Sequence, residues 1–159
     1  MGQYHYVLNF DKKEFLDPHR FGNGLQLMAF GTSSSGTLTG LTLLLAASNG
    51  RGGGDFNVET PHPLTAAVTG RWAGDRVAIV GDYCRDDDVP GFKRLKAVWR
   101  SATEERNGWV DISKAVVAVM RSAVYLRDVD TLKSDLTRAP DSQAYSAWVA
   151  RELLRSKTG

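Results

Sequence analysis

The sequence predicts an α+β fold, a small mixed sheet covered by three to four helices, with a buried helix near residues 36–48. Apolar side chains occupy nearly every side of residues 37–48, a pattern typical of a buried helix. Two other short segments are rich in aromatic and β-branched residues and predict strands. Strands and helices do not alternate regularly enough for a doubly wound sheet. A length of 159 residues favours a single domain, 1–159.

The two predicted strands differ in their patterns. Tyr4–Phe10 alternates, so that Tyr4, Tyr6 and Leu8 fall on one face of the sheet. Arg76–Val80 is apolar on both faces, which predicts a central strand. The polar residues 11–24 are expected to be irregular, and residues 25–30 fit either a strand or a helical turn.

The other helices are predicted from apolar residues at helical spacing. Phe92–Ala102 has such a stripe, and Asp111 or Ser113 can cap a helix that follows. Leu64–Thr69 fits a short helix or a strand. The last helix is expected to start at Asp141 or Ser142.

Composition excludes several classes of protein. The formal net charge of +2 is too small to indicate a nucleic-acid or membrane partner by itself, and we expect neither. The single cysteine, Cys84, cannot form an internal disulfide, which favours a reducing compartment. The first residues lack the basic head and apolar stretch of a signal peptide. We therefore expect a cytoplasmic protein.

The first candidate site is the Gly-Thr-Ser-Ser-Ser-Gly turn at residues 31–36, which leads into the predicted buried helix. Backbone N–H groups at a helix start attract anions, and Ser33, Ser34 and Ser35 can add hydrogen bonds. No lysine follows the last glycine, so this is not a phosphate-binding Walker motif. The alternative is a capping turn with a purely structural role.

The second candidate site is the loop formed by Arg51, Gly52, Gly53, Gly54 and Asp55. Glycines let a backbone approach a ligand closely, an arginine can pair with phosphate, and an aspartate can bind a hydroxyl. The loop superficially resembles the glycine loop of macrodomains, which bind ADP-ribose, although its spacing is shorter.

We favour this loop, with His19 and Arg20 as outer contacts, over the serine turn. One small ligand can hardly reach both ends of a helix about 18 Å long. The alternative for the loop is a flexible surface segment.

No metal site or cofactor is predicted, because the three histidines never fall at two-ligand spacing. No catalytic residues are assigned either. A hydrolase would need His19 or His62 as a base beside Asp55 or Asp82. The five cations of Lys93–Arg106 can contact phosphates, but Glu104 and Glu105 dilute them, and a solvated amphipathic helix is the simpler interpretation.

Several segments together resemble a group of small bacterial and phage proteins. They are Met-Gly-Gln-Tyr at residues 1–4, Asn-Phe-Asp-Lys-Lys-Glu at 9–14, Pro-His-Arg-Phe-Gly at 18–22, Ser-Asn-Gly-Arg-Gly-Gly-Gly-Asp at 48–55 and Gly-Arg-Trp-Ala-Gly-Asp-Arg at 70–76. The resemblance covers about the first half of the chain. It implies no activity, and it favours a cytoplasmic protein of bacterial or phage origin.

The best functional hypothesis is a protein that binds a small anion, such as a nucleotide or an ADP-ribose-like molecule, rather than an enzyme. One alternative is a small hydrolase acting on a phosphorylated or glycosidic substrate. Another is an interaction or regulatory protein that acts through a helical face, with a homo-oligomer as one form.

Overall fold

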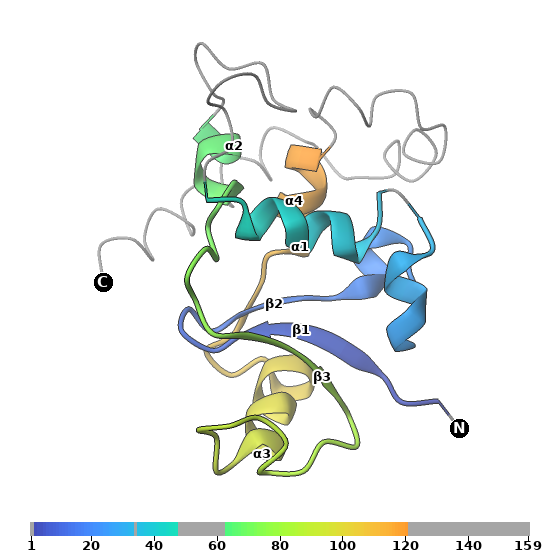
Figure 1. Ribbon diagram of the computed structural model, residues 1–159, viewed down its shortest axis with the longest axis vertical. Coiled ribbons are helices and arrows are strands. Elements are labelled where there is room, and N and C mark those ends of the chain that lie inside the picture. The colour runs from blue at the N-terminus through green and yellow to red at the C-terminus, as the bar shows by residue number, and fades with distance from the viewer. Residues whose placement is uncertain (1, 34, 48–62, 121–159) are drawn as a thin grey trace. The chain divides into compact units, whose positions relative to one another are not determined.

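The computed structural model describes residues 2–33, 35–47 and 63–120, and it contains a mixed sheet with helices, as the sequence predicts (Figure 1). The chain divides into two compact units. Met1–Thr37 and Gly74–Ser113 form unit 1, and Leu38–Ala73 and Lys114–Gly159 form unit 2. Compact units of this kind can belong to one domain, so the single domain stays a prediction. The helix expected from residue 141 or 142 lies outside the described residues.

The sheet belongs to unit 1 and has four strands in the order β3-β1-β2-β4. The pairs β3–β1 and β1–β2 are antiparallel, and β2–β4 is parallel. The strands are β1 (His5–Asn9), β2 (Glu14–Leu16), β3 (Val77–Gly81) and β4 (Val110–Asp111).

Two sequence-based expectations about these strands are wrong. β3 lies at an edge of the sheet and is not central, although it is apolar on both faces. Its Ile79 keeps 37% of its surface exposed. β2 forms inside the segment expected to be irregular, because Phe15 and Leu16 are fully buried beside β1. Three residues are too few for a period of two to be recognised in the sequence.

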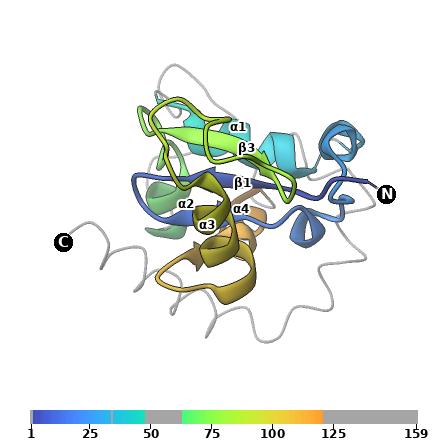
Figure 2. The same ribbon diagram turned by 90° about the horizontal axis from the view of Figure 1, so that it is seen from below.

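Helix α3 (Leu95–Arg100) covers one face of the sheet and continues as a π-helical turn at Ser101–Glu105 (Figure 2). The indole N–H of Trp99 donates a hydrogen bond of 3.2 Å to the carbonyl of Val80, which ties the helix to β3. The buried cluster between helix and sheet consists of Leu8, Phe15, Val80, Leu95, Trp99 and Ala102. The stripe predicted for this helix is therefore confirmed as its core face.

Tyr6 lies beside this cluster, with its ring edge-on to both Phe15 and Trp99 at centroid distances of 6.2 and 6.0 Å. Burial raises the pKa of its hydroxyl, and the carboxylates of Asp17 and Asp111 add to the rise. Tyr6 therefore stays a neutral core residue.

Two 3-10 helices, η1 (Pro18–Phe21) and η2 (Leu27–Gly31), follow β2. The apolar stretch at residues 25–30 is thus helical, and Met28 is 83% exposed on it. Asp17 caps η1 by accepting the N–H of His19 at 3.0 Å. Gly22 ends it in the left-handed region at φ 74°, where glycine is favoured.

Helix α1 (Thr37–Leu45) confirms the helix expected near residues 36–48. Its burial is one-sided, because Leu43 and Leu44 are buried whereas Leu38 and Leu45 are 44% and 43% exposed. In unit 2, Trp72 donates its backbone N–H to the carbonyl of Leu44 at 2.9 Å. The other helices are α2 (Pro63–Val68), which answers the ambiguity at residues 64–69, and α4 (Ser113–Met120).

Asp111 caps α4 by accepting the N–H of Ser113 at 2.9 Å, as the sequence allowed. Val116 and Met120 are buried on this helix. None of the helices within residues 2–33, 35–47 and 63–120 is long and apolar enough to cross a bilayer.

Candidate functional site

The site predicted from sequence is only partly visible in the structure. Arg51, Gly52, Gly53, Gly54, Asp55 and Ser34 lie outside the described residues, so the favoured glycine loop remains a prediction. Of the other predicted contacts, His19 and Arg20 lie in η1, whereas Ser33 and Ser35 lie in the turn before α1.

Asn23 holds the serine turn. We call Asn23 and its partners Ser33 and Thr37 the Asn23 cap. Asn23 is buried, with 4% of the residue exposed. Its side-chain oxygen accepts the backbone N–H of Thr37 at 2.7 Å and the Thr37 hydroxyl at 2.8 Å. Its amide nitrogen lies 3.4 Å from the hydroxyl of Ser33. A Cβ on Gly36 would come within 2.6 Å of the Asn23 oxygen, so only glycine fits there.

Two of the N–H groups that the sequence offered to an anion at this helix start already have partners. Thr37 donates to Asn23, and Gly36 donates to the carbonyl of Ser33 at 3.2 Å. Asn23 makes this cap from 14 positions earlier in the chain, a separation that local sequence patterns do not reveal. This arrangement supports the structural interpretation of the turn.

His19 and Arg20 are also placed next to acidic residues. The Nε of Arg20 lies 4.0 Å from Asp17 and 3.9 Å from Asp111, and the side chain is 43% exposed. Asp17 and Asp111 each act as a helix cap, so this small network has a structural task. Its proximity to the parallel pair β2–β4 follows from the register of Phe15 opposite Asp111.

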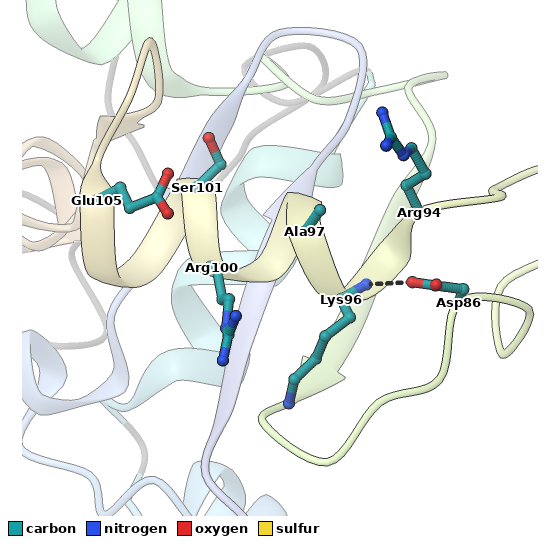
Figure 3. Close-up of a pocket in the computed structure, with 7 residues that line it drawn as sticks. All are labelled: Asp86, Arg94, Lys96, Ala97, Arg100, Ser101 and Glu105. Carbon is teal, nitrogen blue, oxygen red and sulfur yellow. Dashed lines mark hydrogen bonds between the residues drawn. The ribbon is translucent and has the colours of Figure 1, made fainter.

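A different group of residues surrounds a hollow of about 490 Å³ on the exposed side of α3, here called the α3 depression (Figure 3). Ala97 is exposed at its floor and carries only a methyl group between longer side chains. Lys96 and Arg100 point to one side of the helix, whereas Arg94 and Ser101 point to the other (Figure 3). Cations thus flank Ala97 on both sides of the helix, with Arg94 on one side and Lys96 and Arg100 on the other (Figure 3).

The walls follow from the helical period. Trp99 and Leu95 are buried against the sheet, which turns Arg94, Ala97 and Arg100 toward solvent. The carboxylate of Asp86 reaches over from the preceding loop and accepts the backbone N–H of Lys96 at 3.0 Å.

The cations of the depression are weakly neutralised by the protein itself. Among the described residues Arg94 has no ion pair, and the Nε of Arg100 lies 3.9 Å from Glu104 with both side chains more than half exposed. The ammonium of Lys96 lies 5.6 Å over the ring of Trp99, a cation–π contact that leaves its charge in place. Such cations remain available to a ligand anion.

Two acidic residues line the depression: Asp86 beside Lys96, and Glu105 at the end away from Arg94 (Figure 3). Eleven positions separate Arg94 from Glu105 along α3 and the π-helical turn that follows it. The hydroxyl of Ser101 lies between them, one helical turn from Glu105. Arg94 and Lys96 therefore lie toward one end of the depression, and Ser101 and Glu105 toward the other.

The sequence contained the signal for this site, since the cations of Lys93–Arg106 stood out. In the sequence alone these cations favour a solvated helix face, because Glu104 and Glu105 follow them. The sequence does not show that these cations border a hollow. The hollow depends on the short side chain of Ala97 and on Asp86 lying beside Lys96. The aromatic side chains nearby are taken by the core, as expected, so they cannot stack on bases.

Of the groups considered for hydrolysis, only His19 and Asp82 lie within the described residues. The carboxylate of Asp82 accepts the N–H of Tyr4 at 3.0 Å, while His62 and Asp55 lie outside the described residues. Burial raises the pKa of the Cys84 thiol, which makes it a poorer nucleophile. Within the described ranges no three His, Cys, Asp or Glu side chains gather as a metal site would require.

No family model, curated protein or solved structure matches this chain, so its function has to be argued from its own residues.

Proposed function

We propose that this protein binds a small phosphorylated molecule of the nucleotide class in the α3 depression. The observation that supports the proposal is the grouping of Arg94, Lys96 and Arg100 around the exposed methyl of Ala97. Guanidinium and ammonium groups are the usual protein partners of phosphate oxygens. A methyl floor gives a phosphate room to approach them.

The polarity of the depression favours a molecule with two different ends. A phosphate would bind between the three cations, and sugar hydroxyls would donate to the carboxylate of Glu105 and bond to Ser101. Because Arg94 and Glu105 lie at opposite ends of the depression, a ligand that contacts both has to be extended. A nucleotide diphosphate or an ADP-ribose-like molecule has this form.

The binding we expect is modest and sensitive to salt. The side chains are exposed, and exposed ion pairs are weakened by water and by counter-ions.

The test is isothermal calorimetry with ADP, ADP-ribose and inorganic pyrophosphate. Replacing Arg94→Gln and Arg100→Gln together should weaken binding by more than about tenfold, because each charge-assisted hydrogen bond contributes about 1.5–3 kcal/mol. The matched control is Lys93→Gln with Arg85→Gln, which removes the same charge from exposed positions outside the depression. Equal loss in both double variants would attribute binding to net charge, and no heat with any of the three probes would exclude the proposal.

The cellular setting is also a proposal. The resemblance of residues 1–76 to small bacterial and phage proteins supports a cytoplasmic protein from such a source. The contribution of the glycine loop at Arg51–Asp55 stays a prediction, as does the hydrolase alternative. The calorimetric panel includes ADP-ribose because that loop suggested it.

A further inference from the structure

The outer edge of β3 carries a second site, which concerns assembly rather than a small ligand. β3 reads Val-Ala-Ile-Val-Gly and is the first strand in the order β3-β1-β2-β4. No strand of the described residues pairs with its outer edge. A sequence typical of a central strand thus lies at an edge.

Hydrogen bonds at both ends of β3 show which of its backbone groups face outward. Phe10 donates to the carbonyl of Arg76 at 3.0 Å, and Asp82 donates to the carbonyl of Tyr4 at 2.9 Å. In an antiparallel pair such bonded positions alternate, so residues 78 and 80 also face β1. The N–H and C=O groups of Val77 and Ile79 therefore point away from the sheet. In the described part of the chain they have no hydrogen-bond partner.

This edge lacks the features that normally prevent pairing between chains. Natural edges are protected by proline, lysine, bulges or very short strands. The opposite edge fits that rule, since β4 has two residues and includes Asp111. β3 has five residues, all apolar or glycine, and its Ile79 is 37% exposed.

We infer that β3 pairs antiparallel with β3 of a second copy across a two-fold axis at Ile79, which joins the two sheets into one. In this register Ile79 faces Ile79 and exchanges both backbone bonds, as an outward-facing residue must. The N–H of Gly81 meets the C=O of Val77 of the partner subunit, and the symmetry repeats the contact.

The charges that directly flank β3 are complementary in this register. Counting outward from Ile79, Arg76 lies three residues before it and Asp82 three residues after it. Each Arg76 therefore faces Asp82 of the partner subunit directly across the strands. A shift of two residues would instead align the cation with an apolar residue.

The Arg76 side chain can make this contact without giving up those it has. It bonds Asp11 through Nε at 2.8 Å and Nη2 at 2.7 Å, yet remains 67% exposed. A guanidinium has five donors, so donors remain for a second carboxylate. Asp82 uses one carboxylate oxygen on the N–H of Tyr4, and its other oxygen remains to accept.

The first test is the mass of the full chain by size exclusion with light scattering. The inference predicts twice the 17.4 kDa of one chain, and conversion to 17.4 kDa by Ile79→Lys with an unchanged circular dichroism spectrum. The lysine would place two like charges at the axis. A wild-type monomer, an assembly larger than two copies, or a dimer that survives Ile79→Lys would each overturn the inference.

A crosslinking test remains decisive if Ile79→Lys fails to fold. Ile79→Cys in a Cys84→Ser background adds no charge and places two thiols across the axis, where Cα atoms lie about 5.5 Å apart, within disulfide range. Oxidation should give a covalent dimer. The matched control is Val110→Cys, 39% exposed on the opposite edge strand, which should stay monomeric on a non-reducing gel. Equal crosslinking at both positions, or none at position 79, would contradict the two-fold pairing.

Discussion

The Asn23 cap and the α3 depression both gather polar side chains beside a helix, but they differ in how those groups are satisfied. In the cap, one buried oxygen accepts two hydrogen bonds from Thr37. In the depression, the cations are exposed, and Arg94 has no ion pair among the described residues. Buried groups that hydrogen-bond to one another stabilise the fold. Exposed cations without an ion pair are hydrated and can bind an anionic ligand. Mutations can separate the two cases.

The largest effect on stability is expected from Asn23→Ala. The variant leaves the N–H and hydroxyl of Thr37 buried without their acceptor, so it should lower the free energy of unfolding by about 1–3 kcal/mol. Urea denaturation measures the change, and the exposed Asn107→Ala is the control, expected within about 0.5 kcal/mol of wild type. Equal stability of Asn23→Ala and wild type would remove the distinction between the two regions.

The next effect concerns ligand binding without a change in stability. Ala97→Gln fills the floor of the α3 depression with a neutral side chain that favours helix, so stability should stay within about 0.5 kcal/mol. The affinity for ADP should fall about tenfold, which corresponds to about 1.4 kcal/mol. Calorimetry and urea denaturation measure the two quantities on one sample. Unchanged affinity would mean that the phosphate binds elsewhere.

A smaller change in stability is expected from Ser33→Ala. The Ser33 hydroxyl lies 3.4 Å from the amide nitrogen of Asn23, a long hydrogen bond that supplements the two short ones. Its loss should cost less than about 1 kcal/mol, below the cost of Asn23→Ala. Nucleotide affinity should not change. If Ser33→Ala weakened ADP binding as much as Ala97→Gln does, the serine turn would be the binding site.

The smallest effect on stability is expected from Asp11→Asn. Asp11 is exposed, like the cations of the α3 depression, but it is paired, like the groups of the Asn23 cap. Hydrogen bonds from Arg76 lower the pKa of its carboxyl below the ordinary 3.8. The unfolded chain therefore binds the proton more tightly, so the stabilisation is present above about pH 3.8 and is lost as pH falls through the lower, folded pKa. Wild type should be slightly more stable than Asp11→Asn at neutral pH and not in strong acid. A constant difference between them in pH-dependent urea denaturation would contradict this assignment.

The sequence predicted the parts of the fold that depend on local patterns. The helix near residues 36–48, the apolar stripe of α3 and the Asp111 cap all follow from spacings within one or two turns. The position of β3 did not follow, because the apolar character of a strand does not reveal whether its second edge is paired. β2 was missed since three residues carry too little pattern.

The candidate site was predicted less well than the fold for a related physical reason. Both the Asn23 cap and the α3 depression join residues that are distant in sequence: Asn23 to Thr37, and Asp86 to Lys96. The sequence predicts free N–H groups in the turn before α1, yet a distant asparagine accepts the N–H of Thr37 and lies within hydrogen-bond distance of the Ser33 hydroxyl. The cations of α3 alone predict an ordinary solvated helix face. The structure adds that Ala97 lies between them and lines a hollow.

Binding of ADP in the α3 depression can be located directly by nuclear magnetic resonance. The shifts of the backbone amide resonances are mapped during titration with ADP. We expect the largest shifts at residues 94–105, together with Asp86, and small shifts at the Asn23 cap. Raising the salt concentration should shrink these shifts, since the contacts are exposed. Shifts centred on Ser33, Ser35 and Thr37, or no saturable shifts in α3, would contradict it.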